Sequence, residues 1–132
     1  MKIRRSKAEG RKEANSRKSL RHQEYGYEQE RLVEQILAQA KDGNGGYVFD
    51  KVVRHEHNSP PDSEGKDFSV FKRVNGILTE VCFGITISQQ SFFKSKIRHR
   101  GIPQFCFPVG VDPKKVVSRI LGLFDTPTKN YN

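Results

Sequence analysis

Two acidic side chains stand in neighbouring strand-like segments, where they could hold a metal ion together. Asp67 opens the run DFSVFKRV, and Glu80 lies inside the run ILTEVCFGITIS. Because side chains alternate along a strand, Asp67 shares a face with Ser69. On the next strand, Glu80 shares a face with Cys82, Gly84 and Thr86. One polar face could gather both acids around Mg²⁺, which prefers carboxylate oxygens; alternatively, both are ordinary solvent-side residues of a half-covered antiparallel sheet.

Turn and cap residues divide the chain into the elements that would position these acids. Asn75-Gly76, between the two runs, is the strongest short-range signal for an antiparallel hairpin. Asp112 followed by Pro113 is a strong start signal for a last helix. Residues 55–66, with two prolines and a glycine, are expected to form a loop. In chain order, the patterns predict a helix at 27–40, strands at 47–54, 67–74 and 77–88, a helix at 89–100, a strand at 104–109 and a helix at 113–124.

That order of elements, with an acid opening the second strand and another inside the third, resembles the common core of the PD-(D/E)xK, restriction-endonuclease-like nucleases. The resemblance spans roughly Glu24 to Phe124, and Gly65-Lys66-Asp67-Phe68 is similar to the G-x-D approach of the family's second strand. It implies an α/β fold with an αβββαβα core, in which helices flank a mixed central sheet. It also implies that Asp67 and Glu80 bind one or two Mg²⁺, which hold the scissile phosphate and generate the attacking hydroxide.

The sequence departs from the family where the motif lysine should follow the strand acid. Two residues after Glu80 the chain has Cys82, whereas the family's lysine positions or activates the attacking water. Displaced lysines are known in the superfamily, so Lys66, Lys94 or Lys96 could substitute, and loss of catalysis is the alternative. The catalytic candidates are therefore Asp67, Glu80, Cys82, Lys94 and Lys96, with Lys66 as a further possible substitute.

A literal copy of the motif also occurs, in the segment PDSEGK at residues 61–66. Its acids, Asp62 and Glu64, lie two residues apart in one loop punctuated by proline and glycine. The family's acids come instead from two adjacent strands joined by a hairpin. We therefore reject this segment as the metal site.

Other side chains could complete a metal site. Some relatives add a glutamate from the first helix, and Glu30 is the candidate because it lies on the apolar stripe of that helix. Glu28 is the alternative, and both could instead be surface residues. His55 and His57 form an H-x-H that could present two imidazoles on one strand face, or they could be polar residues at a strand end.

Basic residues concentrate in two segments. Residues 1–22 hold nine Lys or Arg against two Glu, which is seven of the chain's nine net positive charges. This segment has few apolar side chains, so we expect a disordered or loosely helical tail that suits a polyanion. In the helix at 89–100, Phe93 and Ile97 are expected to pack, with Phe92 as a further candidate, while the basic residues stay solvated, to contact phosphate or simply to face water. The nucleic-acid candidates are Arg4, Arg5, Arg11, Lys12, Arg17, Lys18, Arg21, Lys94, Lys96, Arg98 and Arg100.

Length and composition predict one domain at 23–124, between the basic tail at 1–22 and a C-terminal tail at 125–132. No apolar run approaches the roughly 20 residues of a membrane span, and none fits a signal peptide. We therefore expect a soluble cytoplasmic protein, since Glu9 and Glu13 fit a transit peptide poorly. Cys82 and Cys106 stand in apolar runs and are expected to be reduced and buried.

Three functions fit this sequence. The first is a nucleic-acid-directed protein, acting on DNA rather than RNA, with Mg²⁺-dependent phosphodiester hydrolysis. The second keeps the nuclease fold as a catalytically degenerate binding or assembly module, for which Cys82 is the main support. The third is a basic adaptor that binds RNA or ribosomes through residues 1–22, with a globular part unrelated to nucleases.

Overall fold

A two-residue turn organises the sheet. The structure is a computed structural model that describes residues 24–125. Asn75 and Gly76 have φ angles of 52° and 82°, and a two-residue hairpin turn with both φ positive matches the twist of its strands. It joins β2 (Phe68–Val74) to β3 (Ile77–Thr86), which pair antiparallel as predicted.

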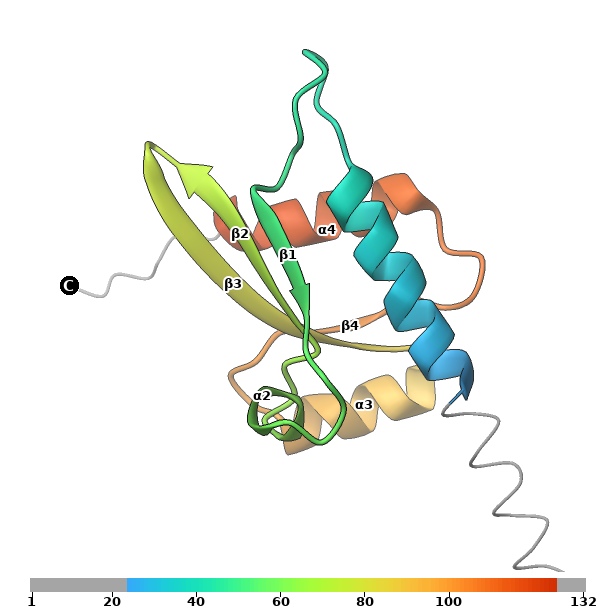
Figure 1. Cartoon of the computed structure of the whole chain (residues 1–132). Coiled ribbons are helices and arrows are strands. Elements are labelled where there is room, and N and C mark those ends of the chain that lie inside the picture. The colour runs from blue at the N-terminus through green and yellow to red at the C-terminus, as the bar shows by residue number, and fades with distance from the viewer. Residues whose placement is uncertain (1–23, 126–132) are drawn as a thin grey trace, which may run out of the picture.

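The remaining strands extend this hairpin into a four-stranded mixed sheet with the order β1-β2-β3-β4. β1 (Lys51–Arg54) lies antiparallel to β2, and β4 (Gln104–Cys106) lies parallel to β3. The parallel pair is joined by α3 (Gln89–Arg98), a crossover that such pairs require. The fold is therefore mixed α/β, and the predicted order of strands and long helices is confirmed (Figure 1).

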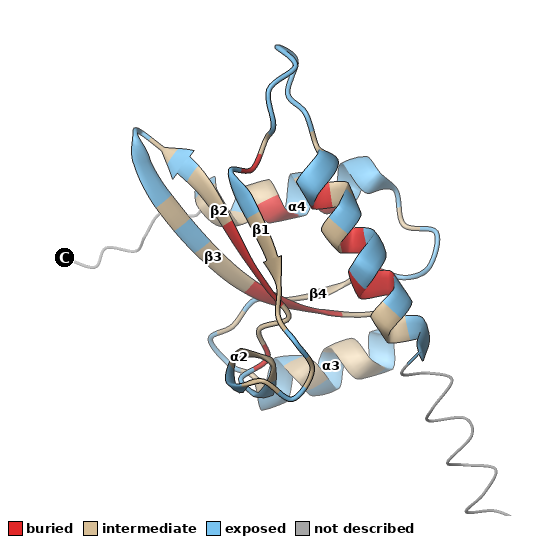
Figure 2. Cartoon of the chain, in the orientation of Figure 1, coloured by how far each residue is buried: buried red, intermediate tan, exposed pale blue. Residues whose placement is uncertain are grey.

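The hydrophobic core lies between the sheet and two helices. The first helix, at residues 24–39, and α4 (Pro113–Asp125) each turn one apolar stripe toward the strands (Figure 2). The fully buried side chains of this core are Val33, Leu37, Phe68, Val70, Phe83, Phe107, Val116 and Ile120. They come from the first helix, β2, β3, the end of β4 and α4. The sheet and both helices thus share one core.

A buried side chain fastens the first helix to the end of β4. Gln29 is 4% exposed, and its Nε2 donates hydrogen bonds of 3.0 Å to the carbonyl oxygens of Phe107 and Pro108. Two carbonyls that leave the sheet are satisfied in this way, which matters because an unpaired buried carbonyl is costly. The neighbouring residue, Glu30, is thereby held at the end of the sheet.

Some boundaries differ from the predictions. The predicted strand at 47–54 pairs with β2 only over Lys51–Arg54, because Val48 N donates instead to the carbonyl of Ala40 and closes the preceding loop. The predicted loop at 55–66 contains a short helix, α2 (Pro60–Ser63), capped by Ser59. Tails were expected at 1–22 and 125–132. Asp125 belongs to α4 instead, and the other residues of both tails lie outside the described residues.

The prediction that Phe93 and Ile97 pack against the core is wrong. They are 60% and 69% exposed, and α3 contains no buried residue. Cys82 and Cys106, expected to be buried, are half-buried free thiols. Within residues 24–125, no helix combines the length and the apolar character needed to cross a bilayer.

Candidate functional site

Asp67 lies at the point where the first three strands converge. Its backbone N–H donates to the carbonyl of Phe83 over 2.9 Å, and its carbonyl accepts from the N–H of His55 over 2.8 Å. Its carboxylate Oδ2 accepts a 2.7 Å hydrogen bond from the backbone N–H of Ile85. Asp67 therefore extends the pairing of β2 by one residue, and β3 holds its side chain in place.

The surroundings of Asp67 disfavour its negative charge. Burial raises the pKa of this carboxyl to about 8, and the Ile85 N–H only partly opposes that effect. The charge of Glu30, and a hydrogen bond and charge from Asp62, raise the pKa further. A carboxyl in such a place is protonated near neutral pH unless a cation or proton donor compensates it.

Glu30 brings a second acid to this end of the sheet. Glu30 is 8% exposed, and His57 Nε2 lies 3.2 Å from each of its carboxyl oxygens. Burial raises the pKa of Glu30, while the hydrogen bond and charge of His57 lower it. The ring of Tyr27 stacks on His57 with 3.7 Å between ring centroids. The first helix and the loop after β1 together fix Glu30, whereas the alternative candidate Glu28 is exposed.

The two histidines do not act as a pair. His55 Nε2 lies 2.7 Å from Ser69 Oγ, which in turn lies 3.3 Å from Cys82 Sγ. His57 turns instead to Glu30. The structure thus separates the imidazoles of the H-x-H into two different hydrogen-bond networks.

A small cavity of about 150 Å³ opens beside Glu30. Tyr27 and Glu30 line it from the first helix, Thr86 from the end of β3 and Ser91 from α3. At about 30 Å³ per water molecule, it has room for about five waters. Small polar ligands or hydrated ions could therefore reach Glu30.

Glu80 does not join the buried Glu30 and the half-buried Asp67. It pairs with Phe71, four residues along β2 from Asp67, which is roughly 13 Å at 3.3–3.4 Å per residue. The two acids share a face of the hairpin, as expected from strand alternation, but Glu80 is exposed near its outer end. One Mg²⁺ with oxygen ligands at about 2.0–2.1 Å cannot bridge that separation. The acid whose charge acts on Asp67 is instead Glu30, which helps to raise the pKa of the Asp67 carboxyl.

Gly84 is the β3 residue beside Asp67. The regular pairing of the hairpin ends at Phe68 and Phe83. Beyond it, Asp67 hydrogen-bonds to Phe83 through its backbone N–H and to Ile85 through its carboxylate, and Gly84 lies between these two residues. A Cβ atom on Gly84 would collide with the side chain of Gln104 and with the backbone carbonyl of Gly65. Gln104 Nε2 donates a 2.9 Å hydrogen bond to that same carbonyl. The space beside Asp67 is therefore already filled.

Thr86 lies two residues beyond Gly84, at the end of β3. Its hydroxyl donates to the carbonyls of Ser88 and Phe105, each over 3.4 Å. Where β3 passes Asp67, it therefore carries glycine and threonine and neither an acid nor a lysine. The two-residue turn fixes the register of the hairpin in advance, because the paired residue numbers along the hairpin sum to 151.

The candidate lysines lie on separate parts of the surface. Lys66 Nζ lies 3.1 Å from Glu64 Oε2, which raises the pKa of Lys66, and the charges of Cys82 and Glu80 add smaller effects of the same sign. Lys94 and Lys96 are exposed on α3, as are Arg98 and, just beyond the helix, Arg100. The candidates from Arg4 to Arg21 lie outside the described residues.

Few of the described side chains could bind a metal ion together. Across residues 24–125, no group of three or more His, Cys, Asp or Glu side chains could hold one. Glu30 and Asp67 supply two carboxyls at this end of the sheet, and Gly84, the β3 residue beside Asp67, supplies none.

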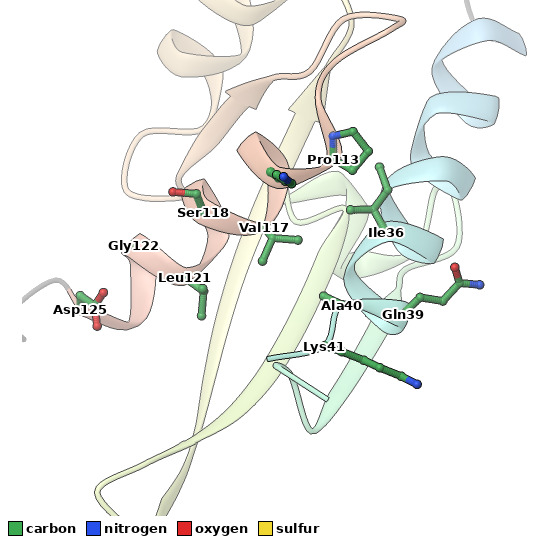
Figure 3. A pocket seen from close by; sticks show the side chains of 11 residues that line it. Ile36, Gln39, Ala40, Lys41, Pro113, Val117, Ser118, Leu121, Gly122 and Asp125 are labelled. Carbon is green, nitrogen blue, oxygen red and sulfur yellow. The ribbon is translucent and has the colours of Figure 1, made fainter. Parts of the chain in front are cut away.

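A larger pocket lies elsewhere. It is a groove of about 950 Å³ between the end of the first helix and α4, with Ile36, Ala40, Val117 and Leu121 on its walls (Figure 3). Its lining is mostly apolar and includes no histidine or cysteine. Comparison with known proteins gives no further assignment, since no family model, curated protein or solved structure matches the chain.

Proposed function

We propose that this chain is a nucleic-acid-binding module on a restriction-endonuclease-like scaffold whose hydrolytic site is degenerate. The observation that carries the proposal is Gly84, which lies between the two β3 residues that hydrogen-bond to Asp67 and has no side chain to bind a metal ion. The αβββαβα order of the long elements and the mixed sheet support the scaffold. The Glu30 and Asp67 carboxyls support a site inherited from a metal-dependent enzyme.

The case against hydrolysis rests on what the site lacks. Metal-dependent phosphodiester hydrolysis needs ligands that fix the cation and a group that orients or activates water. Gly84 cannot be replaced by an acid without displacing Gln104 and the backbone of Gly65. Thr86 has a hydroxyl in place of an ammonium, so it adds no positive charge beside the phosphate. Binding could persist without these groups.

The case for a nucleic-acid partner rests on charge. The chain carries a formal net charge of +9, most of it in residues 1–22. α3 adds exposed cations and has no acidic residue between Gln89 and Arg98. Such a distribution attracts phosphates through counterion release, without regard to sequence. We propose DNA rather than RNA as the partner, and a reducing cytoplasmic location that suits the two free thiols.

A second candidate is a slow Mg²⁺-dependent nuclease. The specific observation in its favour is that the pKa values of Asp67 and Glu30 are both raised. A bound cation would stabilise the ionised form of these two desolvated carboxyls. Lys66 is the described lysine whose charge interacts with Cys82. It would take the role of the missing lysine in that mechanism.

The experiment compares binding and cleavage in the full chain. Fluorescence anisotropy with labelled DNA should show affinity that falls steeply with salt, with a slope of about −0.9 per neutralised duplex phosphate. In millimolar Mg²⁺ the natural protein should cleave no faster than the matched variant Asp67→Asn. Cleavage that disappears in Asp67→Asn would establish the second candidate. Absence of salt-dependent binding would refute the nucleic-acid partner altogether.

A further inference from the structure

The outer face of α3 exposes two large apolar side chains on successive turns. Phe93 is 60% exposed and Ile97 is 69% exposed, and their spacing of four residues places them side by side on a helix. Single exposed apolar residues are normal, but a cluster of them on a helix that buries none is informative. This face, formed by Phe93, Ile97 and the cations beside them, is called the α3 face below.

Aromatic rings and cations lie together on this helix. The rings of Phe92 and Phe93 are 5.7 Å apart at an interplanar angle of 59°. Lys96 Nζ lies 5.2 Å from the centroid of the Phe92 ring. The ammonium group therefore stays close to an aromatic surface, although its side chain is exposed. Flat apolar surface and positive charge are available within one or two helical turns.

The charge continues past the end of the helix. Arg98 and Arg100 line a polar groove of about 700 Å³ between the end of α3 and the segment around α2. Asp62 and Glu64 line the other side of this groove. The positively charged side of the groove is therefore the one that continues from α3. An anionic chain lying along the α3 face would meet Lys94 and Lys96 first and then these two arginines.

We propose that the α3 face binds unpaired nucleotides, with Phe93 stacking on a base and the surrounding cations holding the backbone phosphates. This inference rests on the proposed nucleic-acid function and adds a preference for single strands. Proteins that bind single strands combine a positive track with exposed aromatic rings, and each stacked base contributes about 1–3 kcal/mol. In a duplex the bases stack on one another, so an exposed ring on a helix face has no base face to cover.

The charge of α3 favours a nucleic-acid partner over a second copy of this chain. An apolar helix face that docked a second copy of the chain would bring the cations of α3 against themselves, and like charges at an interface are repulsive. Between Gln89 and Arg100 the sequence has four Lys or Arg and no acidic residue. A polyanion with flat apolar surfaces complements this pattern, and unpaired DNA or RNA has both features.

The primary test replaces Phe93 in the full chain with residues that separate stacking from apolar contact. Phe93→Leu keeps apolar volume but removes the ring, and should weaken binding to a labelled oligo(dT) or oligo(rU) 12-mer by about 5- to 150-fold. Tyr47→Leu is the matched control, because Tyr47 is 66% exposed in the loop between the first helix and β1, at the opposite end of the molecule (Figure 1). It should change the affinity less than twofold.

An abasic oligonucleotide of the same length isolates the stacking contribution. It keeps the phosphates but has no base to stack, so Phe93→Leu and the natural protein should bind it equally. Phe93→Trp gives a direct signal, since the natural chain has no tryptophan. Its fluorescence should be quenched by oligo(dT) and unaffected by a duplex of equal length.

Several outcomes would overturn the proposal. Equal loss on the abasic and normal strands would show that the substitution acts on the fold or on charge. Unchanged affinity of Phe93→Leu for the normal strand would remove the ring from binding, while salt-dependent duplex binding would leave the nucleic-acid function intact. Phe93-dependent binding to anionic vesicles, or a dimer dissociated by Phe93→Leu, without an effect on oligonucleotides would assign the α3 face to a membrane or a second copy.

Discussion

Replacing Asp67 with asparagine should stabilise the protein at neutral pH. Asp67 is protonated in the folded state up to a pKa of about 8, whereas in the unfolded chain it ionises near 3.8. Because the folded pKa is raised, the contribution of Asp67 to stability is fully present below about pH 4. It is lost progressively as the pH rises toward 8. Asparagine stays neutral throughout and can still accept the hydrogen bond from the backbone N–H of Ile85.

The magnitude follows from the width of that pH window. Each pH unit between the two pKa values lowers the free energy of unfolding by about 1.4 kcal/mol. Between the unfolded-state pKa and pH 7, the loss in free energy of unfolding would amount to about 4 kcal/mol. Asp67 shares its environment with Glu30 and Asp62, whose charges respond to the change. We therefore expect Asp67→Asn to raise the free energy of unfolding by about 2–4 kcal/mol at pH 7, and by less than about 1 kcal/mol at pH 4.5.

Urea denaturation between pH 4.5 and 9 measures this difference directly. The curve of variant minus natural protein should rise with pH and level off above about 8. Asp125→Asn is the matched control, because Asp125 is exposed at the end of α4, and its difference curve should be flat. A flat curve for Asp67→Asn, or a loss of stability at pH 8, would refute the conclusion that desolvation keeps the Asp67 carboxyl protonated near neutral pH.

Three further predictions concern Gly84, the carboxyls of Asp67 and Glu30, and the basic tail. Gly84→Ala should destabilise the fold by about 1–3 kcal/mol in urea denaturation, because its Cβ would collide with Gln104 and with the Gly65 carbonyl; an unchanged midpoint would show that the space is open. Millimolar Mg²⁺ at pH 8 should raise the Tm of the natural protein by no more than it raises that of Asp67→Asn, and a larger shift in the natural protein would show a cation at the carboxyl pair. Deleting residues 1–22 should weaken DNA binding and flatten its salt dependence, and an unchanged salt slope would exclude the tail from binding.

Local chemistry made the hairpin and the last helix predictable. Asn75-Gly76 tolerates the positive φ angles of a tight turn, so the two strands and their register follow from two residues. Ser59 followed by Pro60 marks the start of α2 with the same type of signal that Asp112-Pro113 gives for α4. The prolines and glycine around α2 instead favoured a loop, because one helical turn has no periodicity to detect.

The acidic site was predictable only in part. Glu30 could be preferred over Glu28 because it continues the stripe of Val33, which packs in the core. Its partner His57 lies 27 residues away in a loop, and no local pattern relates the two. The error at Glu80 arose from matching residue types without counting the hairpin register, which a two-residue turn fixes.

Phe93 and Ile97 show a different limit. Their helical spacing predicts that they share a face, and the usual partner of an apolar face is the core. α3 instead lies against β3 and β4 without burying any residue, and Phe92 and Ser95 stay half-buried. Periodicity identifies which residues share a face, and only the packing of the neighbouring elements decides whether that face is covered.

The anchorage of the first helix has a consequence for how the chain is made. The carbonyls of Phe107 and Pro108 that Gln29 binds are synthesised 78 and 79 residues after it. At 5–20 residues per second, a ribosome needs about 4 to 16 s to add that length. Helix formation itself takes about a microsecond or less. The first helix can therefore form several seconds before the two carbonyls that fasten it have been made.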